Sequence, residues 1–212
     1  MRKLFDVLNI KREMDALMAQ DKCNRNGQSH WNTEAPWKGS DLKWVTPKDE
    51  SGMRHFQESF NLLRLAEQLS FIGDVTMLTG LYLIRQNTQE KHWHHDFFKT
   101  HRKAFTFITP LQETTDVNLL YKKTLHGPEY TYKYAYGEGI FFGDGFLHCT
   151  EPGRSRKPLS FLCFTFGCKD MGEEAWCSTE LAISGQCRIY NDLQGNLISW
   201  NLKKTSNFKV HV

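Results

Sequence analysis

The stretch at residues 92–96 reads His-Trp-His-His-Asp, and a second stretch at residues 143–148 reads Gly-Asp-Gly-Phe-Leu-His. Side chains of an extended segment alternate between its two faces, so residues two apart point the same way. His92, His94 and Asp96 therefore share one face in our interpretation. The His that ends the second stretch follows a strand-like run, and we expect it to reach the same point from a strand adjacent in space. Together the two stretches predict a cluster of metal ligands.

Two sets of ligands can be drawn from this cluster. Two His and one carboxylate form the facial triad that holds a non-haem Fe(II) ion and leaves coordination positions open. That rule selects His94, Asp96 and His148. The rival set of His92, His94 and His148 has the spacing of cupin metal sites. The Glu that cupins place a few residues later is missing, because the next acidic residue after Asp96 is Glu113. We therefore predict the first set, with His92 as a bystander or a support for the ligands.

A basic turn follows the distal His. Arg154, Arg156 and Lys157 precede an apolar run at residues 158–167. A cosubstrate with two carboxylates that chelates a metal through one end needs a cation for the other. The planar fork of Arg suits this task, because it binds a carboxylate through two parallel hydrogen bonds. The alternative is a charged turn that faces solvent, and we expect at least one of the three residues to be only that.

The first part of the chain is expected to be helical and irregular. Apolar residues at helical spacing predict a helix over residues 1–20, and an apolar stripe predicts another over residues 53–70, with a stop at Gly73. Residues 21–52 read as a long irregular segment pinned by Trp side chains. A segment of that length is either a functional lid or a wrap on the surface.

Strands are expected to dominate the rest. Strand-like runs lie at residues 75–85, 104–110, 117–121, 130–136, 140–142, 159–166, 185–190 and 197–202, with a hairpin turn at 191–195. Helices followed by many short strands favour a mainly β fold, an antiparallel sandwich or jelly roll with flanking helices. We expect a single domain over 1–212, with a helical and irregular part at 1–73, a jelly-roll core at 74–167 and C-terminal strands at 168–212.

Composition argues against several classes of protein. The chain has 212 residues, 40% of them hydrophobic, and a net charge of +3, which is no basic footprint for nucleic acid. No stretch is long enough to span a membrane. Charges recur too soon after the N-terminus for a signal peptide. The 6 Cys form no Cys-x-x-Cys pair, which indicates reduced thiols. We expect a cytoplasmic protein.

With these residues in place, the chain resembles the Fe(II)/2-oxoglutarate-dependent dioxygenase superfamily. The His-x-Asp at residues 94–96, the distal His148 and the basic pair at 156–157 are similar to that superfamily's ligands and cosubstrate anchor. The segment at residues 137–164 resembles the phytanoyl-CoA hydroxylase-like branch. The resemblance covers residues 75–167 and is poor outside them.

The resemblance implies a double-stranded β-helix, a cupin-like jelly roll, in which His94, Asp96 and His148 bind Fe(II). It implies 2-oxoglutarate and O2 as cosubstrates, and a reaction that oxidises a C–H bond while 2-oxoglutarate gives succinate and CO2. Hydroxylation is the expected outcome, and desaturation or ring closure would use the same site. The far carboxylate of 2-oxoglutarate is assigned to Arg156, with Lys157 as the second choice.

Further residues are candidates for contact with the cosubstrate. Tyr82 and Thr106, on expected core strands, are predicted to contribute, and Arg85 and Tyr121 are candidates of the same kind. Arg154 is the third choice for the carboxylate. Each strand residue also has a structural interpretation as part of the core.

Several interpretations of function stay open. A small molecule is the expected substrate, and a protein side chain, as for a peptidyl hydroxylase of the same superfamily, is the second choice. A cupin-type metal enzyme that does not use 2-oxoglutarate is one rival, and a jelly-roll binding module without catalysis is another. Neither a membrane nor nucleic acid is an expected partner.

Overall fold

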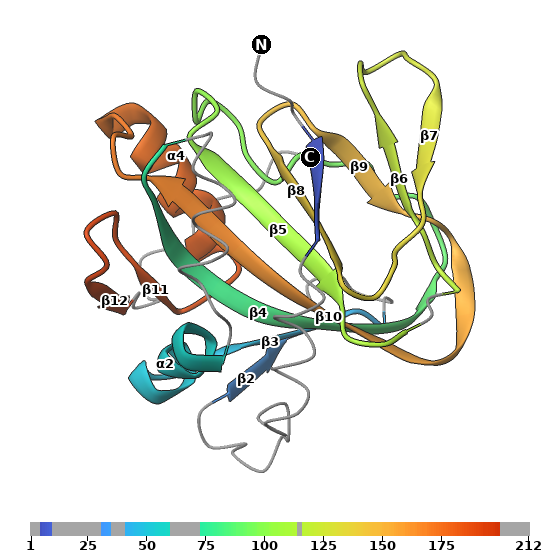
Figure 1. Cartoon of the computed structure of the whole chain (residues 1–212), viewed down its shortest axis with the longest axis horizontal. Helices are drawn as coiled ribbons and strands as arrows, with labels where there is room; N and C mark the ends of the chain where they lie inside the picture. The colour runs from blue at the N-terminus through green and yellow to red at the C-terminus, as the bar shows by residue number, and fades with distance from the viewer. Residues whose placement is uncertain (1–4, 10–30, 35–40, 60–72, 114–115, 200–212) are drawn as a thin grey trace.

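The computed structural model describes residues 5–9, 31–34, 41–59, 73–113 and 116–199. Within these ranges two antiparallel β-sheets share a buried core, and two helices pack outside them (Figure 1). The metal-ligand candidates lie where the two sheets meet.

The larger sheet has seven strands in the order β1-β8-β5-β10-β4-β3-β2. They are β1 (Phe5–Asn9), β2 (Trp31–Glu34), β3 (Lys43–Pro47), β4 (Val75–Thr88), β5 (Ala104–Pro110), β8 (Glu138–Gly143) and β10 (Gly153–Cys168). The long strands β4 and β10 pair from Gly153 against Thr88 to Cys168 against Val75. We refer to these two paired strands as the floor of the site.

The smaller sheet has three strands in the order β7-β6-β9. They are β6 (Leu119–Lys122), β7 (Glu129–Tyr132) and β9 (Leu147–Thr150). A tight turn leads from β8 in the larger sheet to β9 in the smaller one. Gly145 in this turn has a φ of +77°, a conformation that residues with a Cβ rarely adopt. The turn thus carries the chain from one sheet to the other just before His148.

Strand alternation divides the core into two layers. Phe161 of β10 lies in the layer between the two sheets, together with Leu119 of β6. Phe164 of the same strand points to the opposite face, where Phe56 of helix α2 (Glu50–Ser59) packs against it. The layer between the sheets is the one that can line a site.

A helix and a small hairpin lie at one end of the larger sheet (Figure 1). Helix α4 (Glu173–Ser184) is followed by β11 (Ile189–Asn191) and β12 (Leu197–Ser199). The hydroxyl of buried Tyr190 donates to Glu180 Oε1 at 2.8 Å. The side-chain amide of Asn191 donates to the backbone oxygen of Met77 at 3.0 Å. These bonds tie the hairpin to α4 and to β4.

The predicted mainly β fold, with antiparallel sheets and flanking helices, is confirmed. The strand predicted at residues 104–110 has the bounds of β5. The turn predicted at residues 191–195 is present, and Asp192 Oδ1 accepts hydrogen bonds from the backbone N–H groups of Gln194 and Asn196. In the described part of the chain, no helix is long and apolar enough to cross a membrane. The division into a single domain stays a prediction.

The N-terminal prediction is wrong where the structure describes it. Residues 5–9, expected within a helix over 1–20, form strand β1 on the edge of β8. That edge offers rows of backbone donors and acceptors, which an added strand satisfies. The helix expected over residues 53–70 is present as α2 but begins earlier, at Glu50. The remaining residues of both predicted helices lie outside the described residues.

Helices and strands also occupy stretches where the sequence predicted no such element. The segment at residues 21–52, expected to be irregular, contains β2, β3 and the start of α2. The strand expected at residues 185–190 begins only at Ile189. Helix α4 ends at Ser184, and its C-cap is Gly185, so the first residues of the expected strand follow the end of the helix. Helix α4 was not predicted.

Candidate metal centre

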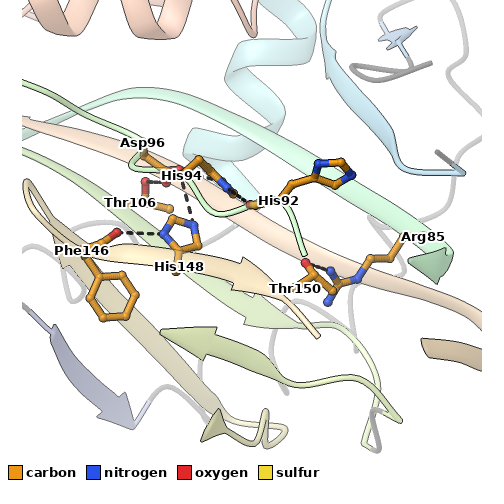
Figure 2. A network of polar contacts seen from close by, with 8 residues as sticks. All are labelled: Arg85, His92, His94, Asp96, Thr106, Phe146, His148 and Thr150. Carbon is orange, nitrogen blue, oxygen red and sulfur yellow. Dashed lines mark hydrogen bonds and ion pairs between the residues drawn. The ribbon is translucent and has the colours of Figure 1, made fainter. Parts of the chain in front are cut away.

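Three side chains from the two opening stretches converge in space. His94 and Asp96 approach His148 of β9, and all three ligand atoms lie within 4.8 Å of one another (Figure 2). Asp96 Oδ1 is 3.5 Å from His94 Nε2 and 3.6 Å from His148 Nε2. Among the residues that the structure describes, this is the one group of three or more such side chains close enough to share a metal ion. The structure brings together the three side chains that the sequence pattern selected, and their role as metal ligands stays a prediction.

Hydrogen bonds hold the two ligand stretches together. The N–H of His94 donates to the backbone oxygen of His148 and the N–H of His148 to that of His94, each at 3.0 Å. His94 therefore pairs with β9 as an isolated bridge, not as part of the longer strand that we expected. The loop after Asp96 is also fixed, since Thr100 Oγ1 donates to Asp144 Oδ1 at 2.6 Å. Backbone and side chains thus set the ligand positions.

The imidazole rings are oriented as metal ligands require. Nδ1 of His94 is 2.8 Å from the backbone oxygen of His92, and Nδ1 of His148 is 3.0 Å from that of Phe146. A carbonyl oxygen can only accept, so both rings carry their proton on Nδ1 and present the Nε2 lone pair. His92 contributes this backbone oxygen, while its own ring turns away from the cluster in Figure 2. The rival ligand set that includes the His92 ring is not assembled.

The electrostatics of the site suit a cation. Burial lowers the pKa of His148 to about 4, although Asp96 opposes the shift, so this imidazole is neutral at pH 7. The side chain of His94 is 37% exposed and that of His148 only 8%, so the cluster opens to solvent on the side of His94. Two imidazoles and one carboxylate with an open side are a donor set that fits Fe(II).

Thr106 of β5 contacts the cluster directly. Its hydroxyl donates to Asp96 Oδ2 at 2.5 Å, which leaves Oδ1 facing the two imidazoles. A hydrogen bond of this kind fixes the rotation of a ligating carboxylate. The structure therefore gives Thr106 a position beside the ligand, whereas its predicted contact with the cosubstrate stays a prediction.

Thr106→Val should weaken metal binding without unfolding the protein. Val keeps the shape and the β-branch but removes the hydroxyl, and loss of such ligand-orienting groups lowers metal affinity by about 10–100-fold. Titration of the metal-free protein with Zn(II) or Mn(II) measures the change. Thr106→Ser keeps the donor and should retain affinity within a few-fold. Equal affinity in the Val variant would contradict the orienting role.

The basic turn lies away from the cluster. Arg154, Arg156 and Lys157 are all exposed, in the part of β10 that precedes Leu159. The pairing of β10 with β4 is irregular there, between Arg154 and Leu159. The backbone N–H of Arg156 is 3.5 Å from Asp116 Oδ2, also at the surface. The structure brings none of the three to the ligands, and their role as cosubstrate anchors stays a prediction without geometric support.

The structure separates the two predicted Tyr candidates. Tyr82 points to the outer face of the larger sheet, where its ring packs on Phe56 of α2 and its hydroxyl lies 2.7 Å from His55 Nε2. This placement argues against contact with a cosubstrate at the ligands. Tyr121 of β6 is different, because it is the register partner of His148 and stacks on Phe146. It borders the ligand cluster.

Three further residues lie on the inner side of the floor. Arg85 of β4 is buried, its guanidinium sits 5.1 Å from the centre of the Phe161 ring, and it donates a hydrogen bond to Thr150 of β9 (Figure 2). Tyr134 and Cys163 lie in the same layer. Only Arg85 was a sequence candidate. The two-residue spacing from Phe161 along β10 is the signal that could have found Cys163, because both side chains then point to the same face.

Comparison with known proteins agrees with this architecture. No protein-family model and no curated protein matches the sequence. Among solved structures, the chain is similar to SnoN, a non-heme alpha ketoglutarate dependent epimerase from nogalamycin biosynthesis, with a TM-score of 0.63 and 14% identity over 79% of each chain. The fold is a double-stranded β-helix.

Two other solved structures share it. HygX from Streptomyces hygroscopicus, solved with nickel and 2-oxoglutarate, has a TM-score of 0.55 and 13% identity over 80% of this chain and 85% of that one. A Pseudomonas putida prolyl-4-hydroxylase has a TM-score of 0.54 and 16% identity over 78% and 92% of the two chains. At such identities the likeness concerns the fold, and the chemistry must be argued from the site.

Proposed function

We propose that this protein is an Fe(II)- and 2-oxoglutarate-dependent dioxygenase. The observation that carries the proposal is the convergence of two Nδ1-protonated imidazoles and one carboxylate within 4.8 Å, with an open side. Such a facial set suits Fe(II) and leaves coordination positions for a cosubstrate and O2. The similar folds of SnoN and HygX, described with alpha ketoglutarate or 2-oxoglutarate, support the same conclusion.

The residues of the chain have distinct tasks in this proposal. His94, Asp96 and His148 would hold the ion, and Thr106 would keep the carboxylate of Asp96 in position. Iron with 2-oxoglutarate and O2 supplies oxidising chemistry that protein side chains lack. The apolar layer around Phe161 would keep water from the reacting C–H bond.

A small molecule is the proposed substrate, and hydroxylation of an unactivated C–H bond, with release of succinate and CO2, is the proposed reaction. SnoN has been solved with nogalamycin RO and HygX with hygromycin B. A protein side chain is the second candidate, favoured by the likeness to a prolyl-4-hydroxylase. Within the superfamily we place the chain in the phytanoyl-CoA hydroxylase-like branch, on the resemblance of residues 137–164. A cytoplasmic location stays a prediction.

Fe(II)-loaded protein should convert 2-oxoglutarate to succinate under air, and EDTA should stop the conversion until Fe(II) is restored. NMR of the reaction mixture follows both compounds, with ascorbate present to keep the iron ferrous. Zn(II)-loaded protein is the control, because zinc has no redox chemistry. If no succinate forms and the metal-loaded protein also fails to bind 2-oxoglutarate, the proposal is wrong and a cupin-type metal enzyme is favoured.

A further inference from the structure

Arg85 is a buried charge with few partners. The residue is 6% exposed, and its position opposite Leu159 in the β4–β10 register places it on the inner face of the larger sheet. Nη1 donates to the hydroxyl of Thr150, the Phe161 ring covers the guanidinium, and Nε is buried with no hydrogen-bond partner. A buried polar group without a partner is costly, so an unpaired guanidinium needs an explanation.

No carboxylate of the described residues forms an ion pair with Arg85. Burial lowers the pKa of the guanidinium, and Tyr134, Cys163 and Asp41 only partly oppose that shift. Asp41 is otherwise engaged, since its Oδ2 accepts the backbone N–H groups of Gln86 and Asn87. Arg stays charged in proteins, so it cannot relieve the cost by losing its proton. An anion from outside the chain would relieve it.

Arg85 and the ligand cluster both adjoin strand β9. Thr150, which Arg85 contacts, stands two residues after His148 on β9, so both side chains point to one face, about 7 Å apart along the strand. Burial raises the pKa of Cys163, Asp96 raises it further and Arg85 lowers it. The Cys163 thiol therefore lies within electrostatic range of both the Asp96 carboxylate and the Arg85 guanidinium. The strand spacing between His148 and Thr150 is comparable with the length of a five-carbon dicarboxylate.

We propose that Arg85 binds the far carboxylate of the 2-oxoglutarate whose other end meets the metal ligands. The inference rests on the proposed function and assigns the cosubstrate anchor to β4, not to the exposed basic turn of β10. Arg85 of β4 pairs in register with the apolar Leu159 of β10. The positive charge at this level of the inner face therefore comes from β4. Thr150 and Phe161 hold the guanidinium in place, and the Nε–H remains available to a carboxylate oxygen.

Calorimetry on Mn(II)-loaded protein tests the assignment without turnover. Arg85→Gln should weaken 2-oxoglutarate binding by roughly 10–100-fold, the range for losing a hydrogen bond to a charged group. The preference for 2-oxoglutarate over pyruvate, which lacks the far carboxylate, should vanish in the same variant, an effect that a purely structural role would not produce. Arg54→Gln, on the exposed face of α2, should leave both properties unchanged.

The possible results separate this proposal from the proposed function. Wild-type affinity and preference in Arg85→Gln, or their loss in Arg156→Gln instead, would overturn the role of Arg85. If Arg85→Gln does not fold, Arg85→Lys keeps the charge but not the fork, and an unaltered preference for 2-oxoglutarate in it would also overturn the role. Arg85-dependent binding without succinate formation contradicts only the proposed reaction. Failure of the wild type to bind 2-oxoglutarate overturns both.

Discussion

Asp96→Ala should abolish stoichiometric Fe(II) binding and lower 2-oxoglutarate turnover by more than about 100-fold, since even groups that only support metal ligands are worth about 10–100-fold. Asp96 supplies the single carboxylate of the cluster and the oxygen that faces both imidazoles. Its removal leaves two imidazoles and no negative charge to balance the cation. The fold should persist, because within the described residues this carboxylate accepts only the hydrogen bond from Thr106.

Metal content after desalting, turnover and the thermal midpoint should be measured together. Asp170→Ala is the matched control: it removes the same group from a side chain that is 72% exposed and pairs with Lys103. The control should keep full metal content and turnover, because exposed ion pairs contribute little to stability. An Asp96→Ala protein that retains one Fe(II) per chain would contradict the ligand assignment, even if its turnover were low.

The ligand cluster could be predicted because its signal is local and chemical. A His-x-Asp pair and a His at the end of a Gly-rich turn carry their meaning in residue type and spacing, and the structure brings His94, Asp96 and His148 together. The expected strand geometry is only partly right, because His94 forms a single bridge with His148 and does not belong to a longer strand. The backbone bonds between the two stretches achieve the convergence that strand alternation was expected to give.

The floor of the site could not be read in the same way. Both faces of β4 are covered, one by the smaller sheet and one by α2, so its sequence shows no alternation between polar and apolar residues. The sequence alone therefore could not show that Tyr82 faces α2 whereas Arg85 faces the layer between the sheets. Only the register with β10 separates the two, and register depends on pairing across the sheet.

Closeness in sequence to the distal His made the basic turn attractive as an anchor. Three cations within four residues satisfy the chemical requirement, but the strand that carries them bends at an irregular pairing and leaves them in solvent. Burial distinguishes Arg85 from these residues. A charge that faces water costs nothing without a ligand, whereas a buried guanidinium without an ion pair is retained only where something compensates for it.

Phe164→Ala should reduce the free energy of unfolding by about 3–5 kcal/mol, the range for removing a buried aromatic ring. The residue is 1% exposed, and its ring packs edge-on against Phe56 of α2 and parallel to Phe107 of β5. It also fills the space over Gly80, where a Cβ would lie 3.0 Å from its ring. Because domains of this kind have a total stability of roughly 5–15 kcal/mol, the loss is a large fraction of the whole.

Urea denaturation followed by Trp fluorescence measures the change, and Phe98→Ala is its matched control. Phe98 is 59% exposed, so the same truncation there should cost less than about 0.5 kcal/mol. Phe164 lies on the outer face of the floor, whereas the ligands and Arg85 face the inner side. The folded fraction of Phe164→Ala should therefore bind Mn(II) with the affinity of the wild type. Equal losses of stability in the two variants would contradict the packing described for α2, β5 and β10.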